Sequence, residues 1–259
     1  DEYYRSMMRA KKSLGQNFLM HARIAERIAL AAKLSLDTAV FEIGPGTGTL
    51  TRELLKLTKK VIALEADREL FEKLQNNFTA EIADGRLELI YGDIRTFDIG
   101  MLPKEYALVA NIPYYLTGEI FRMFLSSSHQ PSSMTLLVQK EVAERIARAK
   151  KESILSLSVK VYGTPRYEFT VPRGAFNPTP NVDSAVLSIR GISRNNFSSP
   201  AEEQKFFTLI HAGFAHKRKF VRNNLAEVGF SSDSFPEKAR AEDLGLSQWL
   251  AIIREKNQS

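Results

Sequence analysis

Cysteine is absent from the 259 residues, so disulfide bonds and thiolate metal sites are excluded. Histidine is scarce, and no two of its four positions lie at the spacing of metal ligands: His21, His129, His211 and His216. No apolar run approaches the ~20 residues that a membrane helix needs, and the first residues contain no apolar core of a secretory signal. We therefore expect a globular protein that binds no metal and does not associate with a membrane.

The composition, 44% apolar and 25% charged, is ordinary for a globular protein, and the length suits one large domain or a large and a small one. The net charge of +6 is spread unevenly. Residues 28–136 carry a net charge of −3, whereas residues 1–27 carry +3 and residues 137–173 carry +4. An acidic body between basic segments suits an enzyme with an anionic macromolecular partner, although chance clustering on a solvated surface gives the same pattern.

Four short, mainly apolar segments are typical of buried strands, and each leads into polar residues. The segments are 40–43 before the glycines of 44–48, 61–64 before Glu65, 87–90 before Asp93, and 107–110 before Asn111. Helical patterns between them indicate an α/β fold. Because ligands of open α/β sheets bind at the carboxyl ends of parallel strands, we expect these polar residues to meet at one site.

The glycine-rich stretch 44–48 (GPGTG) lies between an expected strand and an expected helix over 50–57. Such a turn lets a ligand approach the backbone and the helix N-terminus closely, and Gly44 and Gly46 are candidate contacts. The dinucleotide fingerprint requires glycine at position 49, where Thr49 stands. Glu42 before the glycines is more typical of S-adenosylmethionine enzymes than of nicotinamide enzymes. A turn with a purely structural role remains the alternative.

Two carboxylates at later strand ends complete a candidate nucleotide site. Glu65 follows the glycine-rich stretch by about twenty residues, which is where an acidic residue binds ribose hydroxyls in related sheets. Asp93 faces the same expected crevice and can accept a hydrogen bond from an adenine amino group.

The stretch Asn111, Ile112, Pro113 and Tyr114 leaves the fourth strand in an unusual way. Pro113 lacks an N–H and holds Ile112 in extended geometry, so the Ile112 carbonyl can face a ligand. Asn111 offers an amide oxygen, and Tyr114 offers a ring for stacking. Together they suit a planar base with an amino group, such as adenine; a loop with a packed tyrosine is the alternative.

The region after residue 190 predicts a second, smaller domain. A stretch rich in Gly, Ser and Asn at 191–200 is expected to be a linker, and helical patterns follow it. We therefore predict a catalytic domain over 1–194 and a small helical domain over 195–259. Its basic cluster is a candidate for phosphate contacts with RNA, with an ordinary exposed helix face as the alternative: Lys217, Arg218, Lys219 and Arg222.

Six segments, in this order, resemble the small-subunit rRNA adenine N6-dimethyltransferase (KsgA) family. They are 12–19 (KSLGQNFL), 42–48 (EIGPGTG), 111–114 (NIPY), 139–143 (QKEVA), 176–184 (FNPTPNVDS), and 218–225 with its RK and RNNL motifs. The resemblance spans nearly the whole chain. It implies a Rossmann-like methyltransferase domain with a small α-helical C-terminal domain. The implied reaction transfers methyl groups from S-adenosylmethionine to N6 of two adjacent adenosines near the 3′ end of small-subunit rRNA.

The resemblance also implies roles for single residues. Asn17 and Leu19 are expected near the methionine end of the cofactor, with Gly44 against it, Glu65 on its ribose and Asp93 on its adenine. Asn111 and Tyr114, with Pro113 between them, are expected to meet the target base, and Phe176 to stack on its other face. Asn111 is also expected to border the cofactor. The expected partner is rRNA in a pre-ribosomal particle, bound by a monomer in the cytoplasm, with a mitochondrion or plastid as the alternative location.

One departure and three rival functions stay open. A charged segment over 149–154 (AKKESI) replaces a longer Gly/Pro-containing loop of the family, which affects the expected RNA contacts rather than the cofactor site. Large-subunit rRNA methylases share the NIPY-type and FNPTP-type motifs, and the RK and RNNL motifs favour the small-subunit branch. The remaining two rivals are a non-catalytic assembly or transcription factor on the same fold, and a methylase of DNA or free nucleotides.

Overall fold

The computed structural model describes residues 17–231 and 236–254, so the first part of the 12–19 segment, residues 12–16, lies outside the described residues. The chain forms two compact units. The first contains the residues up to Ala143 together with Arg166–Arg190, and the second contains Glu144–Pro165 together with the residues from Gly191 onward. We describe each unit by itself.

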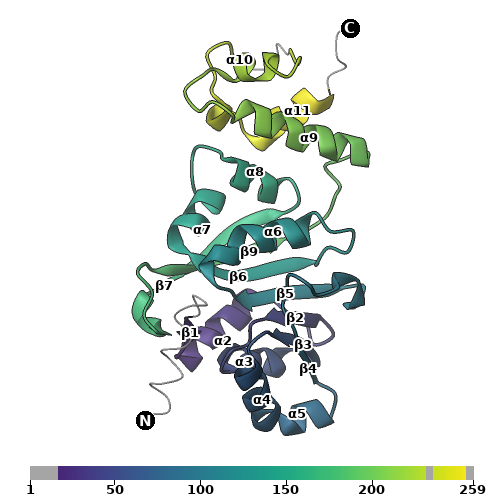
Figure 1. Cartoon of the computed structure of the whole chain (residues 1–259), viewed down its shortest axis with the longest axis vertical. Helices are drawn as coiled ribbons and strands as arrows, with labels where there is room; N and C mark the ends of the chain where they lie inside the picture. The colour runs from purple at the N-terminus through teal and green to yellow at the C-terminus, as the bar shows by residue number, and fades with distance from the viewer. Residues whose placement is uncertain (1–16, 232–235, 255–259) are drawn as a thin grey trace. The chain divides into compact units, whose positions relative to one another are not determined.

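The first unit is built on a seven-stranded sheet whose labelled strands can be followed in Figure 1. The strands are β2 (Ala39–Ile43), β3 (Lys60–Glu65), β4 (Leu87–Tyr91), β5 (Tyr106–Asn111), β6 (Ser133–Gln139), β7 (Thr164–Val171) and β9 (Ser184–Arg190). Their order is β4-β3-β2-β5-β6-β9-β7, in which β4 to β6 run parallel and β9 runs antiparallel to β6. The expected mainly parallel α/β sheet is therefore confirmed.

The strand order reverses between β2 and β5, which makes this pair the switch point of the sheet. The pairing is continuous, because Ala39 lies beside Tyr106 and Ile43 beside Ala110. β3 extends the other side of β2 in the same direction. The residues that follow β2, β3 and β5 consequently come out at one edge of the sheet.

Helices cover both faces of this sheet. They are α2 (Ala22–Ala31), α3 (Thr49–Leu57), α4 (Arg68–Asn77), α5 (Thr79–Ala83) and α6 (Thr117–Leu125), while α7 (Lys140–Ala147) has residues in both units. Val40 belongs to an apolar cluster with Ile28 of α2 and Leu54 of α3. The next residue, Phe41, points to the opposite face, where its ring centroid lies 6.1 Å from that of Phe124 in α6. The alternation of buried side chains along β2 thus fixes a three-layer arrangement.

A short two-stranded sheet joins two segments that are far apart in sequence. Strand β1 (Phe18–Leu19) pairs antiparallel with β8 (Phe176–Asn177), so that Leu19 lies opposite Phe176. The Met20 N–H extends this contact by donating to the Ala175 carbonyl at 3.0 Å. This pairing brings the 17–19 segment and the FNPTP motif to one place.

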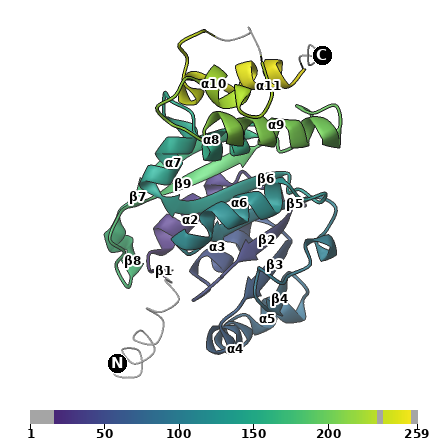
Figure 2. The same cartoon turned by 45° about the horizontal axis from the view of Figure 1, so that its top comes forward.

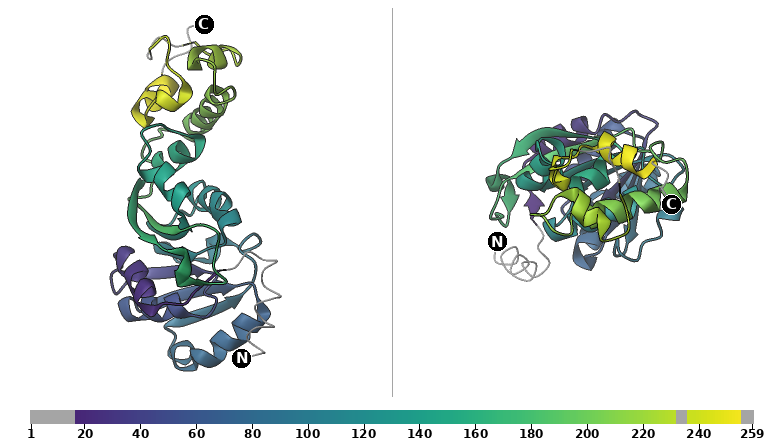
Figure 3. Two further views of the ribbon diagram at one scale, coloured as in Figure 1. Left: turned by 90° about the vertical axis from the view of Figure 1, so that its left-hand side faces the viewer. Right: turned by 90° about the horizontal axis from the view of Figure 1, so that it is seen from above.

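The second unit is helical, with α8 (Ile154–Lys160), α9 (Pro200–Gly213), α10 (Val221–Ala226) and α11 (Leu246–Arg254). Helices α9 and α11 run side by side (Figures 2 and 3). Trp249 of α11 is fully buried, and its ring leaves no room for a side chain at Gly213, where a Cβ atom would lie 2.4 Å away. The close approach of these two helices therefore depends on a glycine facing a tryptophan.

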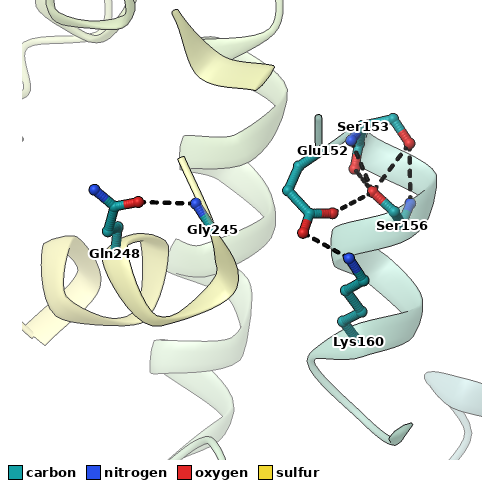
Figure 4. Close-up of polar contacts among 6 residues, drawn as sticks. All are labelled: Glu152, Ser153, Ser156, Lys160, Gly245 and Gln248. Atoms are coloured by element: carbon teal, nitrogen blue, oxygen red, sulfur yellow. Dashed lines mark hydrogen bonds and ion pairs between the residues drawn. The ribbon is translucent and has the colours of Figure 1, made fainter. Parts of the chain in front are cut away.

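The charged segment 149–154 belongs to this second unit. The Glu152 N–H donates to the Glu242 carbonyl at 2.8 Å, and Lys151 forms ion pairs with Glu242 and Asp243. The Glu152 carboxylate accepts hydrogen bonds from the Ser156 hydroxyl and the Lys160 ammonium, each at 2.6 Å (Figure 4). The contacts with Glu242 and Asp243 fasten the segment onto the C-terminal part of this unit, and the Glu152 carboxylate fastens it onto α8.

Two further contacts cap helices of this unit. At the start of α8, the Ser153 hydroxyl accepts a hydrogen bond from the Ser156 N–H at 3.1 Å (Figure 4). At the start of α11, the Gln248 side chain accepts a hydrogen bond from the Gly245 N–H at 2.9 Å (Figure 4). The boundary at 194/195 between a catalytic and an RNA-binding domain stays a prediction about function. In the fold, the helical unit also takes in residues 144–165 from the middle of the chain.

Candidate active site

A pocket opens at the carboxyl edge of the sheet in the first unit, with about 640 Å³ of empty space when the open solvent at its mouth is included. It lies at the switch point, where β2 and β5 are neighbours. Its lining comes from the 17–19 segment, the glycine-rich turn after β2, the end of β3 and the NIPY stretch after β5: Asn17, Phe18, Leu19, Glu42, Gly44, Pro45, Gly46, Thr47, Thr49, Leu50, Glu65, Asn111, Ile112, Pro113 and Tyr114. The structure therefore brings most of the predicted site residues together.

The turn after β2 has the backbone geometry of a ligand-binding loop. Gly44, Gly46 and Gly48 have φ angles of 66°, 60° and 80°, in the left-handed region that favours glycine. A Cβ atom on Gly46 would lie 3.0 Å from the Phe18 ring, and one on Gly48 would lie 2.5 Å from the Phe78 ring. Side chains are thus excluded at Gly46 and Gly48, and Thr49 and Leu50 at the start of α3 line the pocket.

Glu65 is buried and ties this turn to the end of β3. One carboxylate oxygen accepts from the Gly46 N–H at 3.0 Å, and the other accepts from the Asp67 N–H at 2.9 Å. Each oxygen has a second lone pair, and the carboxylate lines the pocket. Glu65 can therefore accept from ligand hydroxyls while it holds the glycine turn in place.

Glu42 is the second buried carboxyl group of the pocket, and one of its oxygens, Oε2, makes no hydrogen bond with any described residue. Burial raises the pKa of Glu42 to about 8, with a smaller increase from the nearby Glu65 carboxylate and an opposing effect of the Thr51 hydroxyl. A buried acceptor without a donor is costly. Glu42 therefore marks a position where a ligand that carries a donor or a positive charge fits.

Asn111 ends β5 with its amide already oriented. Its Nδ2 donates to the backbone carbonyl of Asn17 at 3.1 Å, across 94 positions of sequence. Because the amino end of the amide makes this contact, the Oδ1 atom at its other end is left to accept a hydrogen bond from a ligand. No described residue donates to the adjacent Ile112 carbonyl. Two oxygens of neighbouring residues are thus available to accept hydrogen bonds at the pocket wall.

Tyr114 is held by its hydroxyl, which forms a 2.6 Å hydrogen bond with the Ser184 hydroxyl at the start of β9. Burial raises the pKa of Tyr114, with the hydrogen bond to Ser184 opposing the increase, so the phenol stays neutral at ordinary pH. The ring lines the pocket next to Pro113, which begins a turn of 3₁₀ helix over Tyr114–Leu116. Tyr114 therefore presents a fixed aromatic wall beside the two acceptors.

Two predicted residues lie apart from the pocket lining. Phe176 is only 3% exposed and packs in the apolar cluster with Leu19. Asp93 is exposed beyond the end of β4, and its side chain accepts a hydrogen bond from the Arg95 N–H at 2.9 Å. Their roles toward the target base and the cofactor adenine stay predictions.

Sequence reasoning did not assign several lining residues to the site, although each neighbours one that it did assign. Phe18 lies between Asn17 and Leu19, Pro45 and Thr47 lie on either side of Gly46, and Ile112 follows Asn111. Alternation along a strand would have placed Phe18 on the opposite side from its neighbours. All three nevertheless line the pocket.

The four predicted RNA-binding residues lie in the second unit, in and before α10. Lys217, Arg218 and Lys219 are exposed, whereas Arg222 is half-buried. Lys219 pairs with Glu227 at 2.9 Å and Arg222 with Glu237 at 3.2 Å. Lys217 and Arg218 make no ion pair with a described residue, which leaves them as the cations best suited to an external phosphate.

The fold and the pocket define a Rossmann-like methyltransferase. The chain belongs to the ribosomal RNA adenine dimethylase family, since the model of that family matches residues 7–258. The described residues contain no cluster of three acidic or histidine side chains suited to a metal ion, and no helix that could cross a membrane.

Curated relatives and solved structures agree with this assignment. The ribosomal RNA small subunit methyltransferase A of Dehalococcoides mccartyi is 38% identical over 262 residues, which cover 96% of this chain and 89% of the relative. The protein of that name from Fusobacterium nucleatum is 34% identical and covers 94% of this chain and 96% of its own length. Among crystal structures, the 23S rRNA methyltransferase ErmE has a TM-score of 0.77 at 25% identity and covers 92% of this chain and 98% of its own. A dimethyladenosine transferase from Plasmodium falciparum has a TM-score of 0.76 at 26% identity, with 91% and 95% covered.

Proposed function

We propose that this protein transfers methyl groups from S-adenosylmethionine to N6 of two adjacent adenosines near the 3′ end of small-subunit rRNA. The observation that carries the proposal is the pair of acceptors at the end of β5. Asn111 has its N–H side bonded to Asn17, and the Ile112 carbonyl next to it has no donor among the described residues. An adenine amino group has two N–H bonds to offer to two such oxygens.

The pocket residues fit S-adenosylmethionine by their chemistry. Glu42 has a buried oxygen without a donor, which suits an ammonium group, and Glu65 has lone pairs for ribose hydroxyls. When bound, the cofactor supplies an electrophilic methyl group on a sulfonium. Asn17 and Leu19 are proposed to meet its methionine end, Gly44 and Gly46 its backbone-facing side, and Asp93 its adenine.

Methylation of the target adenine depends more on the alignment of its amino group than on a general base that removes a proton. Its amino lone pair is delocalised into the ring and is a poor nucleophile. Hydrogen bonds from the amino group to Asn111 Oδ1 and the Ile112 carbonyl favour a pyramidal nitrogen, whose lone pair can be aimed at the methyl carbon. Because methyl transfer is an in-line displacement, positioning supplies much of the rate.

The aromatic residues assist by stacking. The Tyr114 ring can stack on a base that has left its own stack and can stabilise the positive charge that passes to the amine. Phe176 is proposed to contact the base from the other side. The methylated ammonium is acidic and can lose its proton to water, so a neutral Tyr114 is no obstacle to turnover.

The proposed substrate form is rRNA within a pre-ribosomal particle, bound by a monomer. The exposed Lys217 and Arg218 supply phosphate contacts, with Lys219 and Arg222 beside them. The bacterial sources of the small-subunit relatives favour the cytoplasm as the place of action.

The test uses the purified full chain, labelled S-adenosylmethionine and small-subunit particles that lack the methyl marks. We expect label at N6 of two adjacent adenosines, and we expect Asn111→Ala to abolish transfer while cofactor binding persists. Asn76→Ala, which changes an exposed asparagine of α4 in the same unit as Asn111, is the matched control. Absence of label in the rRNA would reject the proposal.

A second candidate is methylation of large-subunit rRNA, which the likeness to ErmE supports. Large-subunit particles and protein-free 23S rRNA serve as parallel substrates in the same assay. Label on these alone would assign the protein to that branch. A role without catalysis would show instead as full complementation of a deletion strain by the Asn111→Ala variant.

A further inference from the structure

Tyr115 is an exposed aromatic residue directly after the acceptor motif, and the proposed function gives it no role. It is 60% exposed, whereas its neighbour Tyr114 lines the pocket and is tied to Ser184. The Tyr115 hydroxyl makes no hydrogen bond with any described residue. Exposure of a large ring beside a binding pocket costs hydration free energy that burial in the core would have avoided.

The ring has one specific neighbour, Arg95, from the loop after β4. The Arg95 guanidinium carbon lies 5.9 Å from the centroid of the Tyr115 ring, within the range of a cation–π contact. The contact joins the loop after β4 to the turn after β5, so both side chains lie on the edge of the sheet that carries the pocket. The pair forms a flat aromatic surface with a positive charge at its side.

Arg95 is held loosely enough to bind an external group. Its only ion pair with a described residue is to Glu119 of α6 at 3.6 Å, which is longer than a hydrogen bond, and the two side chains are 48% and 35% exposed. An arginine has five N–H donors in a planar fork that matches a phosphate. Arg95 therefore retains donors for a phosphate near the Tyr115 ring.

We propose that Tyr115 and Arg95 bind the nucleotide next to the target adenosine, with Tyr115 stacking on its base and Arg95 contacting its phosphate. The proposal rests on the proposed function. When one of two adjacent adenosines enters the pocket, the other loses a stacking partner. Single-stranded bases are commonly held by aromatic rings and guanidinium groups. A ring one residue beyond the pocket wall is placed to replace the lost partner.

The direct test measures steady-state methylation of small-subunit particles by the full chain. Loss of one base–aromatic stack lowers affinity about 5- to 150-fold, so Tyr115→Ala should lower kcat/KM for particles by that factor, mainly through KM. Tyr115→Phe keeps the ring and should stay within about twofold of wild type. Arg95→Gln should reduce kcat/KM and weaken its dependence on salt. Met101→Ala, which removes another exposed apolar side chain of the same unit, is the matched control.

A second measurement identifies the contacted base. Particles are reconstituted with an abasic nucleotide in place of the adenosine next to the target. If Tyr115 stacks on that base, wild type and Tyr115→Ala should act on these particles equally, because the abasic site has already removed the contact. Additive losses would overturn the assignment.

Cofactor affinity separates the remaining outcomes. Dissociation constants for S-adenosylhomocysteine, measured by calorimetry, should be unchanged in Tyr115→Ala. Weaker cofactor binding with unchanged KM for particles would place the ring in the cofactor site and overturn the proposal. Wild-type kinetics in Tyr115→Ala would also overturn the proposal. A wild-type protein that labels no particle would overturn the proposed function and this inference together, whereas the other outcomes leave the proposed function standing.

Discussion

Single buried side chains determine what the pocket can bind, and Glu42 is the clearest case. It is 1% exposed beside Glu65, so two carboxyl groups share one wall of the pocket. Glu65 has two backbone N–H donors, whereas Glu42 Oε2 has no partner among the described residues. Burial without a donor on Oε2 therefore favours the neutral form of Glu42 until a ligand with a donor or a positive charge arrives.

This difference predicts how the stability of the free protein depends on pH. The pKa of Glu42 is raised from 4.5 to about 8, so between these values the unfolded chain loses a proton that the folded protein keeps. The free energy of unfolding should therefore fall as pH rises through this window, with a contribution of up to about 1.4 kcal/mol per pH unit. Glu42→Gln should remove this contribution. Urea unfolding from pH 5 to 8 measures how the free energy of unfolding changes with pH, and the exposed Glu105→Gln is the control. The same pH dependence in wild type and Glu42→Gln would contradict the prediction.

The elements of the sheet follow from the sequence because their patterns are local. The mainly apolar segments at 40–43, 61–64, 87–90 and 107–110 all lie in parallel strands, and the polar residues after them emerge at one edge. The segment 154–161 is compatible with either a strand or a helix by its pattern, and the structure has a helix there. Its Ser153 cap involves a hydrogen bond that alternation does not reveal.

Contacts between distant segments are what the sequence does not supply. The Asn111–Asn17 hydrogen bond orients the key amide, and it joins residues 94 positions apart. The placement of 144–165 with the C-terminal helices depends on pairs such as Lys151 with Glu242. No periodicity encodes such pairs, so the site residues could be named but not their mutual orientation.

One such contact sets the loop between α9 and α10. Asn224 is buried, and its Nδ2 donates to the carbonyls of Gly213 at 2.6 Å and His216 at 3.2 Å. These bonds fix the start of the loop that carries Lys217 and Arg218. Asn224 is therefore a positioning residue rather than a direct RNA contact.

We predict that Asn224→Leu leaves the Gly213 carbonyl without its side-chain donor and destabilises the second unit by about 1–3 kcal/mol, whereas the His216 carbonyl keeps the Lys219 N–H. Affinity for small-subunit particles should fall, while cofactor affinity in the first unit stays as in wild type. Filter binding and calorimetry measure the two constants, and the exposed Asn195→Ala in the same unit is the matched control. If thermal unfolding and particle binding were both unchanged, Asn224 would have no positioning role.

On the scale of the whole molecule, the net charge of +6 is less informative than its distribution. Many cations are engaged by acids within their own unit, including Lys219 by Glu227 and Arg222 by Glu237. Lys217 and Arg218 make no ion pair with described residues and are exposed. Phosphate binding releases counterions, so cations that contact RNA can be recognised by the dependence of affinity on salt.

The double substitution Lys217→Ala with Arg218→Ala should therefore weaken particle binding roughly tenfold at moderate salt. It should also reduce the slope of log affinity against log salt by about 1.4 to 1.8, because two phosphate contacts are lost. Lys33→Ala with Lys104→Ala removes the same charge from exposed positions of the first unit and serves as the control. If charge acts only through the overall field of the protein, both pairs will change the slope equally. A smaller slope for the 217/218 pair alone, with cofactor affinity unchanged, would assign RNA binding to the second unit and methyl transfer to the first.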